Sequence, residues 1–314
     1  MKTVNIVTSA YNEEECLPEL FRRIDEVFKS ESEYDYRIIV ADNASTDSTW
    51  KMITEAARNN PKISANRMSR TFSFDAALRS GIDNCTGDVA VIMTSDLQDP
   101  PEVIPQLLRN YEAGYEQVLV KITSRETVPF VRRILSAIFY KLAHRMTDGL
   151  LPESVSDFRL LARNAYKGIS SMRENHSFVR GLGAWVGFKT TTVEIERPPR
   201  FAGESKFLGF SLLTAITMSF RSLLAYSVTP LMWISFLGIF LSAFFFLAVI
   251  VLSIIWFAVG VPFAGFGSII GLIGLGFSLI LLSLGIIAQY IGLIYEEVKK
   301  RPLYVVAESI NSSF

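Results

Sequence analysis

Short apolar runs alternate with amphipathic stretches through the first two-thirds of the chain. The apolar runs are rich in β-branched residues and bounded by polar turns, which predicts strands at residues 4–8, 36–41, 89–93 and 117–122. Helical periodicity predicts helices between them at residues 17–28, 49–58, 74–84 and 103–111. Alternating strands and helices indicate an α/β fold, in which helices cover both faces of a largely parallel, Rossmann-like sheet.

After residue 122 the pattern is less regular. It predicts a longer helix at residues 128–146, a mixed segment at 154–162 and a strand at 190–196, before Pro198 and Pro199 interrupt it. Residues 206–221 are apolar on one face and end in Arg221, which is typical of a helix lying in a membrane interface. An ordinary core helix would show the same pattern.

The last third of the chain is apolar. Between Ser222 and Tyr295 it contains no Asp, Glu, Lys, Arg or His. One membrane-spanning helix needs about 20 residues, so the stretch is long enough for two crossings. We place these transmembrane helices at residues 231–259 and 266–294, with Gly260 and Pro262 breaking the helix between them.

Positive charge at the outer ends of this hairpin predicts its orientation. Arg221 precedes the first helix and residues 299–301 follow the second. The positive-inside rule therefore predicts an integral protein of the cytoplasmic (inner) membrane, with both termini in the cytoplasm. The expected divisions are a catalytic domain at 1–205, a juxtamembrane helix at 206–229, the hairpin at 230–296 and a cytoplasmic tail at 297–314. Glycines in the second helix either favour a homo-oligomer by close packing or are neutral.

Charge and cysteine content exclude some classes of protein. The chain has 31 basic and 31 acidic residues, so its net charge gives no field that would attract nucleic acid. Cys16 and Cys85 lie far apart in the sequence and indicate reduced, buried thiols, not a disulfide or a metal site.

Polar segments directly follow three of the predicted strands. They are Ala10-Tyr11-Asn12-Glu13-Glu14, the run from Asp42 to Asp47, and Asp96-Leu97-Gln98-Asp99-Pro100-Pro101. Ligands of open α/β sheets bind beyond the carboxyl ends of the strands, so the three segments are expected to converge on one site.

Oxygen-bearing side chains in the third segment predict a metal site. Extended geometry would place Asp96 and Gln98 on the same side of the backbone, where they could bind Mg²⁺ or Mn²⁺. Asp99 precedes Pro100 and is expected to cap the following helix.

The first two segments suit a nucleotide. Tyr11 could stack on a base and Glu13 could accept a hydrogen bond from a ribose hydroxyl. Asp47 is expected to cap the helix near Ser48, whereas Asp42, at the strand end, is expected to bind a base or ribose.

With these segments the chain resembles the polyprenyl-phosphate sugar transferases of glycosyltransferase family 2, which are inverting enzymes that include bactoprenol glucosyltransferases and dolichol-phosphate mannose synthases. The resemblance extends through Glu102 and includes Ser-Asp-Phe-Arg-Leu at residues 156–160, Arg-Phe-Ala-Gly-Glu-Ser-Lys at 200–206 and the segment 290–304. It covers essentially the whole chain, including the apolar hairpin.

The resemblance implies a GT-A fold and transfer of a sugar from a nucleotide diphosphate sugar, with UDP-glucose as the first candidate, to polyprenyl (undecaprenyl) phosphate at the cytoplasmic membrane face. Mg²⁺ or Mn²⁺, held by Asp96 and Gln98, would neutralise the leaving diphosphate. The candidates for binding the nucleotide sugar are Ala10, Tyr11, Glu13, Asp42, Ser95 and Arg125. The candidates for binding the acceptor phosphate are Arg132, Arg133, Arg200, Ser205 and Lys206, some of which could equally form a basic surface facing solvent or lipid headgroups.

Asp157 matches the family's position for a catalytic base. A lipid phosphate is already ionised near pH 7, so little proton removal is needed. We therefore expect Asp157 to orient the acceptor, or a neighbour such as Arg159, at least as much as it abstracts a proton.

The chain departs from the family pattern at several positions. Thr94 stands where the family usually has a second acidic residue, and Ile122 stands where many relatives have Arg. Asn43 and Ala44 stand where Asp or Gly and Ser are common. Thr94 and Ile122 support an alternative, in which the chain is a non-catalytic, membrane-anchored protein that binds a nucleotide sugar or a partner subunit.

Overall fold

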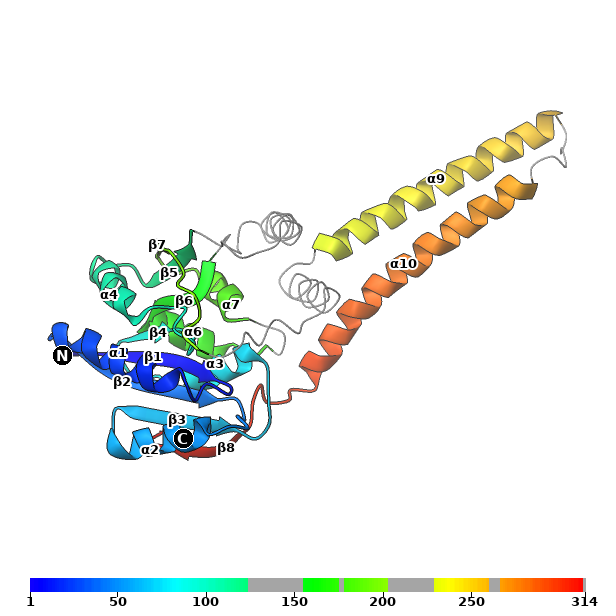
Figure 1. Cartoon of the computed structure of the whole chain (residues 1–314). Helices are drawn as coiled ribbons and strands as arrows, with labels where there is room; N and C mark the ends of the chain where they lie inside the picture. The colour runs from blue at the N-terminus through cyan, green and yellow to red at the C-terminus, as the bar shows by residue number, and fades with distance from the viewer. Residues whose placement is uncertain (124–154, 175–177, 203–228, 260–265, 313–314) are drawn as a thin grey trace. The chain divides into compact units, whose positions relative to one another are not determined.

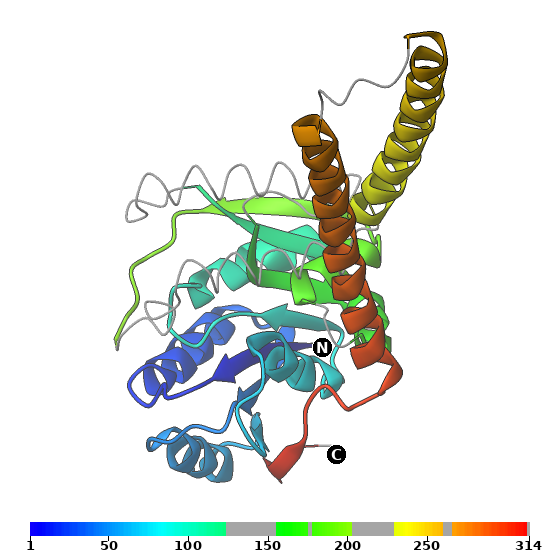
Figure 2. The ribbon, with the colours of Figure 1, turned by 90° about the vertical axis from the view of Figure 1, so that its right-hand side faces the viewer.

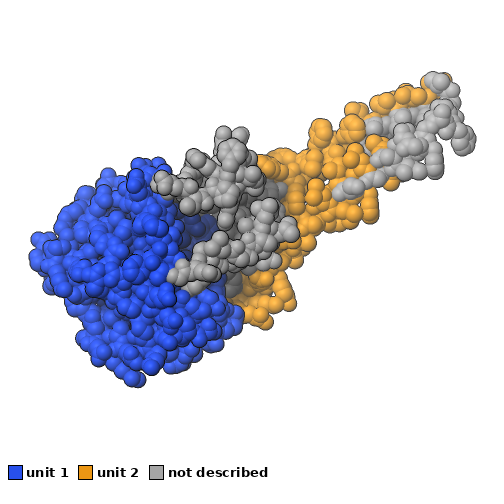
Figure 3. Space-filling view, viewed as in Figure 1, with its two compact units in different colours: residues 1–219, 302–314 blue, residues 220–301 orange. Residues whose placement is uncertain are grey.

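The computed structural model describes residues 1–123, 155–174, 178–202, 229–259 and 266–312 (Figure 1). The chain forms two compact units, which are coloured separately in Figure 3. Unit 1 comprises residues Met1–Ser219 and Pro302–Phe314, and unit 2 comprises Phe220–Arg301. Each unit is described by itself.

Unit 1 is built around an eight-stranded sheet with the strand order β7-β5-β6-β4-β1-β2-β3-β8. The strands are β1 (Lys2–Ala10), β2 (Tyr34–Asp42), β3 (Ile63–Met68), β4 (Val89–Ile92), β5 (Gln117–Ile122), β6 (Val155–Ala162), β7 (Thr190–Ile195) and β8 (Val306–Ile310). The four central strands β4, β1, β2 and β3 run parallel. β6 is antiparallel to both of its neighbours, and β8 is antiparallel to β3.

Helices cover both faces of this sheet, as predicted (Figures 1 and 2). The helices are α1 (Leu17–Ser30), α2 (Thr49–Asn59), α3 (Phe74–Asp83), the 3₁₀ turn η1 (Pro101–Val103), α4 (Ile104–Glu112), α6 (Arg163–Ser171) and α7 (Val179–Trp185). Successive strand residues point to opposite faces, so Ile6 joins the core under α1, α2 and α4, while Val7 joins the core under α3, α6 and α7.

The predicted strands and helices of unit 1 are confirmed within a few residues, except the helices at 128–146 and 206–221, which lie outside the described residues. The sequence did not predict β3 or β8. In β3, Ser64 and Asn66 are polar yet buried, so the strand lacks an apolar run. β8 is short and half polar, and it lies in the segment expected to be a cytoplasmic tail.

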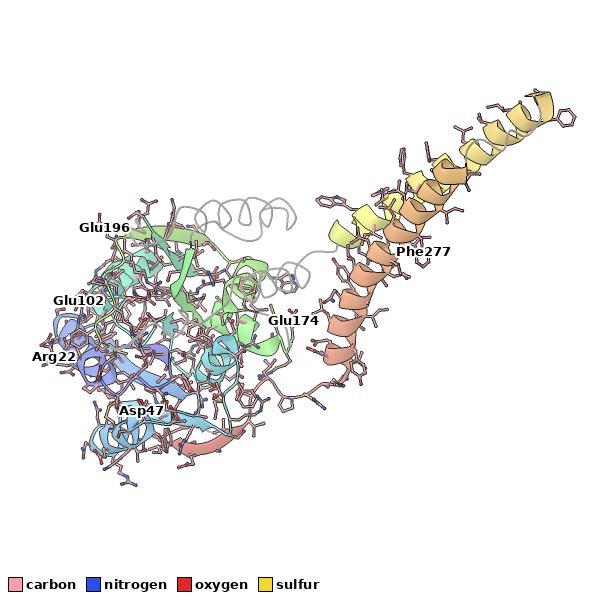
Figure 4. All side chains as sticks on the ribbon, turned by 45° about the vertical axis from the view of Figure 1, so that its right-hand side comes forward. Arg22, Asp47, Glu102, Glu174, Glu196 and Phe277 are labelled. Carbon is pink, nitrogen blue, oxygen red and sulfur yellow. The ribbon has the colours of Figure 1, made fainter. Side chains whose placement is uncertain are left out.

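Unit 2 contains two long apolar helices, α9 (Thr229–Val259) and α10 (Phe266–Val298). Both lie where helices were predicted. Among the described residues, the stretch Leu275–Val298 is the one long and apolar enough to cross a membrane. Large side chains such as Phe257 and Phe277 are exposed on these helices. Phe277 is labelled in Figure 4. Such exposed apolar surface indicates association with a membrane. The predicted interface helix at 206–221 and the break after Val259 lie outside the described residues.

Candidate active site

The three polar segments after β1, β2 and β4 meet at one edge of the sheet. These strands are neighbours, and Ala10 pairs with Asp42 at their carboxyl ends. The Asn12 amide donates to Ser45 Oγ at 2.9 Å, which joins the first segment to the second. The Ser95 hydroxyl donates to the Ser9 carbonyl at 2.9 Å, which joins the third segment to the end of β1. The predicted convergence is therefore confirmed.

Each of the three segments contains one residue with a left-handed backbone. The φ angles are 54° at Asn12, 59° at Ala44 and 60° at Leu97. This conformation costs a residue with a Cβ atom roughly 1–2 kcal/mol, and asparagine tolerates it better than alanine or leucine. Such strain is typical of functional sites, where the surrounding structure holds it in place.

Replacing Ala44 with Gly is expected to stabilise unit 1 by about 1 kcal/mol, because glycine adopts positive φ without steric cost. The measurement is thermal unfolding of the full-length protein in detergent. Ala56→Gly, inside α2, is the matched control and should lower the melting temperature. A lower melting temperature for Ala44→Gly would contradict the assigned backbone strain.

Arg200 connects the first and third segments. Its Nη2 donates to Glu13 Oε1 at 2.7 Å and Oε2 at 2.6 Å, and its Nη1 lies 3.5 Å from Asp96 Oδ2. Its Nε donates to the carbonyl of the nearby residue Ala202 at 2.7 Å, and this local hydrogen bond also holds the guanidinium in place. Only 16% of the Arg200 side chain is exposed, against 7% for Glu13 and 15% for Asp96. One guanidinium thus neutralises two carboxylates at the sheet edge.

Asp96 lies in a turn, because Leu97 has positive φ. Its Oδ1 accepts hydrogen bonds from Thr94 Oγ1 at 2.8 Å and from the Gln98 amide at 3.2 Å. The expected extended backbone at residues 96–98 is therefore wrong, since the turn folds the Gln98 backbone back toward the carboxylate, and Gln98 as a metal ligand stays a prediction.

The residues around Asp96 suit a metal that is shared with a substrate. They offer the Asp96 carboxylate and the Thr94 hydroxyl, and the predicted ligand Gln98 follows in the same turn. In the described part of the chain, no three His, Cys, Asp or Glu side chains gather in a group that could hold a metal. Mg²⁺ commonly uses one or two protein carboxylates and takes its other ligands from water and phosphates. The donor set fits an ion of that kind.

Asp99 does not cap a helix, contrary to expectation. Its carboxylate is fully buried and faces Thr94, which follows β4. Oδ2 accepts a hydrogen bond from the Thr94 amide at 2.9 Å and lies 2.8 Å from Thr94 Oγ1, whose single proton it shares with Asp96. Arg197 lies 3.6 Å from Oδ1. Burial raises the pKa of Asp99. Thr94, which replaces the usual acid, therefore bridges Asp99 and Asp96.

Asp42 is completely buried, so its carboxylate presents no surface to a ligand in this structure. It accepts a hydrogen bond from the Ser45 hydroxyl, and its Oδ2 lies 3.6 Å from Arg67 Nε. Burial raises the pKa of Asp42. Its side chain turns inward and shapes the segment, and its predicted role in binding a base or ribose stays a prediction. Asp47 accepts a hydrogen bond from the Thr49 amide at 3.0 Å and caps α2, as predicted.

Asp157, on β6, lies in a second cluster of charged groups. Its Oδ1 lies 3.0 Å from Arg180 Nε. Arg159 is fully buried and donates from Nη2 to the Ser156 carbonyl at 2.8 Å, and burial lowers its pKa to about 10. Asp75 accepts a hydrogen bond from the Val179 amide at 2.9 Å. Burial, together with the nearby charge of Asp157, raises the pKa of Asp75 to about 6.

Sequence reasoning missed Asp75 and Arg180 in this cluster. Asp75 lies in the first turn of α3, where an acidic residue is explained by the helix dipole, and Arg180 belongs to the short helix α7, which was not predicted.

The other predicted site residues divide between the described and undescribed parts of the chain. Ala10 and Ser95 are buried and Tyr11 is exposed, all at the sheet edge where the segments meet. Arg200, predicted to bind the acceptor phosphate, instead contacts Glu13 and Asp96. Five candidates lie outside the described residues: Arg125, Arg132, Arg133, Ser205 and Lys206.

Comparison with known proteins identifies the family. Residues 5–170 match the family described as Glycosyl transferase family 2. The uncharacterized glycosyltransferase YkcC of Bacillus subtilis is 34% identical over 305 residues, which cover 97% of this chain and 93% of the relative. The bactoprenol glucosyl transferase of Shigella phage SfII is 33% identical over 307 residues, which cover 98% of each chain.

A solved structure supports the fold. The glucosyl-3-phosphoglycerate synthase of Mycobacterium tuberculosis, in complex with Mn²⁺, uridine diphosphate and phosphoglyceric acid, has a TM-score of 0.50 and 19% sequence identity, covering 73% of this chain and 78% of that one. The chain is a glycosyltransferase with a GT-A-like α/β fold, and it belongs to glycosyl transferase family 2.

Proposed function

We propose that this chain transfers a sugar, with inversion, from a nucleotide diphosphate sugar to polyprenyl phosphate at the cytoplasmic face of the membrane. UDP-glucose is the first candidate donor. The observation that carries the proposal is the position of Asp96, which lies at the carboxyl edge of the sheet between the Thr94 hydroxyl and the Arg200 guanidinium. Relatives named bactoprenol glucosyl transferase match nearly the whole chain, which supports a lipid acceptor.

The donor diphosphate would bind beside Asp96. Mg²⁺ or Mn²⁺, held by Asp96 and Gln98, would supply positive charge to the leaving nucleoside diphosphate. Arg200 adds a fixed positive charge at the same place, and Glu13 holds its guanidinium by two hydrogen bonds. We therefore assign Glu13 to orienting Arg200, and Tyr11, which is exposed, to stacking on the base.

The acceptor phosphate would approach Asp157. Because this phosphate is already ionised, Asp157 acts mainly by orienting Arg180, which lies 3.0 Å away and can bind phosphate. Arg125, Arg132, Arg133, Ser205 and Lys206 are proposed to complete the phosphate sites.

The membrane part is proposed to be a hairpin in which α9 and α10 both cross the bilayer. Residues 299–301, directly after α10, carry three positive charges, which supports cytoplasmic termini. A homo-oligomer is proposed from the glycines of α10.

The test is sugar transfer by the full-length protein in liposomes that contain undecaprenyl phosphate. Radiolabelled UDP-glucose and a panel of other sugar nucleotides are supplied with Mg²⁺ or Mn²⁺, and lipid-linked sugar is separated by chromatography. We expect transfer from one donor, with UDP-glucose tested first. Nucleotide binding without transfer from any donor would support the non-catalytic alternative, which the Thr94 position favours.

A further inference from the structure

We infer that the C-terminal strand β8 positions the two segments proposed to bind the nucleotide, and that it does so through the ion pair of Glu308 with Arg67. The kinetic part of this inference rests on the proposed function, but the structural part does not. Glu308 and Arg67 act as positioning residues, because the contacts run from them through Asp42 and Ser45 to the sheet edge.

The first step joins β8 to Arg67. β8 lies at the edge of the sheet beside β3 (Figure 1), and Glu308 is directly opposite Arg67. Arg67 Nη1 lies 3.2 Å from Glu308 Oε1, while Trp50 Nε1 donates to Glu308 Oε2 at 3.2 Å. The Arg67 guanidinium also lies 5.7 Å from the Trp50 ring centroid. Glu308 thus fixes the guanidinium between a carboxylate and an aromatic ring.

The second step joins Arg67 to the nucleotide segments. Arg67 Nε lies 3.6 Å from Asp42 Oδ2, and Nη2 donates to the Ser45 carbonyl at 3.4 Å. Asp42 is fully buried, so a nearby positive charge favours its ionised form. Asp42 accepts a hydrogen bond from the Ser45 hydroxyl, and Ser45 Oγ accepts one from the Asn12 amide at 2.9 Å. The contacts therefore run without a gap from β8 to the segment that contains Tyr11 and Glu13.

The third step is the attachment of β8 itself. Before the strand, the Tyr304 hydroxyl donates to Asp83 Oδ2 at 2.7 Å. After it, Asn311 Nδ2 donates to the Ala57 carbonyl at 2.7 Å and to the Ile63 carbonyl at 3.0 Å. The strand is therefore held on both sides of Glu308. α10 ends at Val298 and β8 begins at Val306, so the strand follows the apolar helix closely along the chain.

The variant that tests this role is Glu308→Gln, because an amide oxygen keeps the hydrogen bond from Trp50 and loses the charge opposite Arg67. The matched control is Glu194→Gln on β7, the other edge strand. Glu194 is opposite Lys121, forms an ion pair at 2.8 Å and has 55% side-chain exposure, the same as Glu308.

Two readouts separate the structural and kinetic parts in the full-length protein. We expect Glu308→Gln to speed hydrogen exchange at the Asn12 and Ser45 amides and to raise KM for UDP-glucose about twofold to fivefold, with kcat unchanged. Glu194→Gln should change neither quantity. In an Arg67→Gln background, Glu308→Gln should have no further effect.

The inference is overturned if Glu308→Gln matches the control in hydrogen exchange, or if it lowers kcat and leaves KM unchanged. If the wild-type protein transfers no sugar from any nucleotide, the proposed function fails, and hydrogen exchange alone decides the positioning role.

Discussion

Asp96→Asn is expected to lower kcat/KM for sugar transfer by about three orders of magnitude. The asparagine amide keeps an oxygen for the Thr94 hydroxyl and the Gln98 amide, so the turn should persist. It loses the negative charge that would hold a divalent ion and face Arg200. The expected result is therefore a folded protein whose melting temperature falls less than that of Arg200→Ala, because Arg200 keeps its two hydrogen bonds to Glu13. Its chemical step should be slow, measured by initial rates of lipid-linked sugar formation.

Asp35→Asn is the control for this variant. Asp35 also forms an ion pair, with Lys62 at 2.6 Å, but it lies near the amino end of β2, at the edge opposite the site. Its replacement should leave kcat/KM unchanged within a factor of about two. Equal activity of Asp96→Asn and Asp35→Asn would refute the role of Asp96.

Arg200→Ala is expected to lower the melting temperature by about 6–12 °C, because it leaves two nearly buried carboxylates without their shared counter-charge. Breaking a buried pair by removing one partner costs about 3 kcal/mol, which is the basis of that figure. Thermal unfolding in detergent measures the change, and sugar transfer should fall as well, because the positive charge beside the diphosphate is gone.

A second substitution tests the reason for this loss. Adding Glu13→Gln to Arg200→Ala removes one of the two uncompensated charges, so part of the lost stability should return. Arg22→Ala is the matched control, because Arg22 also pairs with two carboxylates, Glu19 and Glu26, but on an exposed helix face. A loss of stability as large for Arg22→Ala as for Arg200→Ala would contradict the assigned importance of the buried pair.

The strand-and-helix pattern predicted the framework of the site, because hydrophobic periodicity and the order of the strands along the chain are enough to determine it. Apolar runs locate β1, β2 and β4, and parallel strands bring their carboxyl ends to one edge. The convergence of the three polar segments follows from the chain order alone. The direction of each side chain does not, because a single left-handed residue, such as Ala44 or Leu97, turns its neighbours in a way that hydrophobic periodicity does not encode.

Two carboxylates show this limit. Asp42 was expected to face a base or ribose and Asp99 to cap a helix, yet both carboxylates are buried and turn toward Ser45 and Thr94 respectively. The contact between Arg200 and Asp96 could not be predicted either, since the two residues are far apart along the chain and no periodic pattern links them. The role of β8 could not be predicted because a short strand at a sheet edge needs few apolar residues.

The most direct measurement is anomalous diffraction from crystals of the full-length protein soaked with Mn²⁺ and UDP-glucose. The account predicts a manganese peak that touches the carboxylate of Asp96 and the diphosphate of the donor, with the base of the nucleotide beside Tyr11. A donor bound elsewhere on unit 1, or a diphosphate at this edge with Asp96 still facing Arg200 and no metal between them, would contradict it.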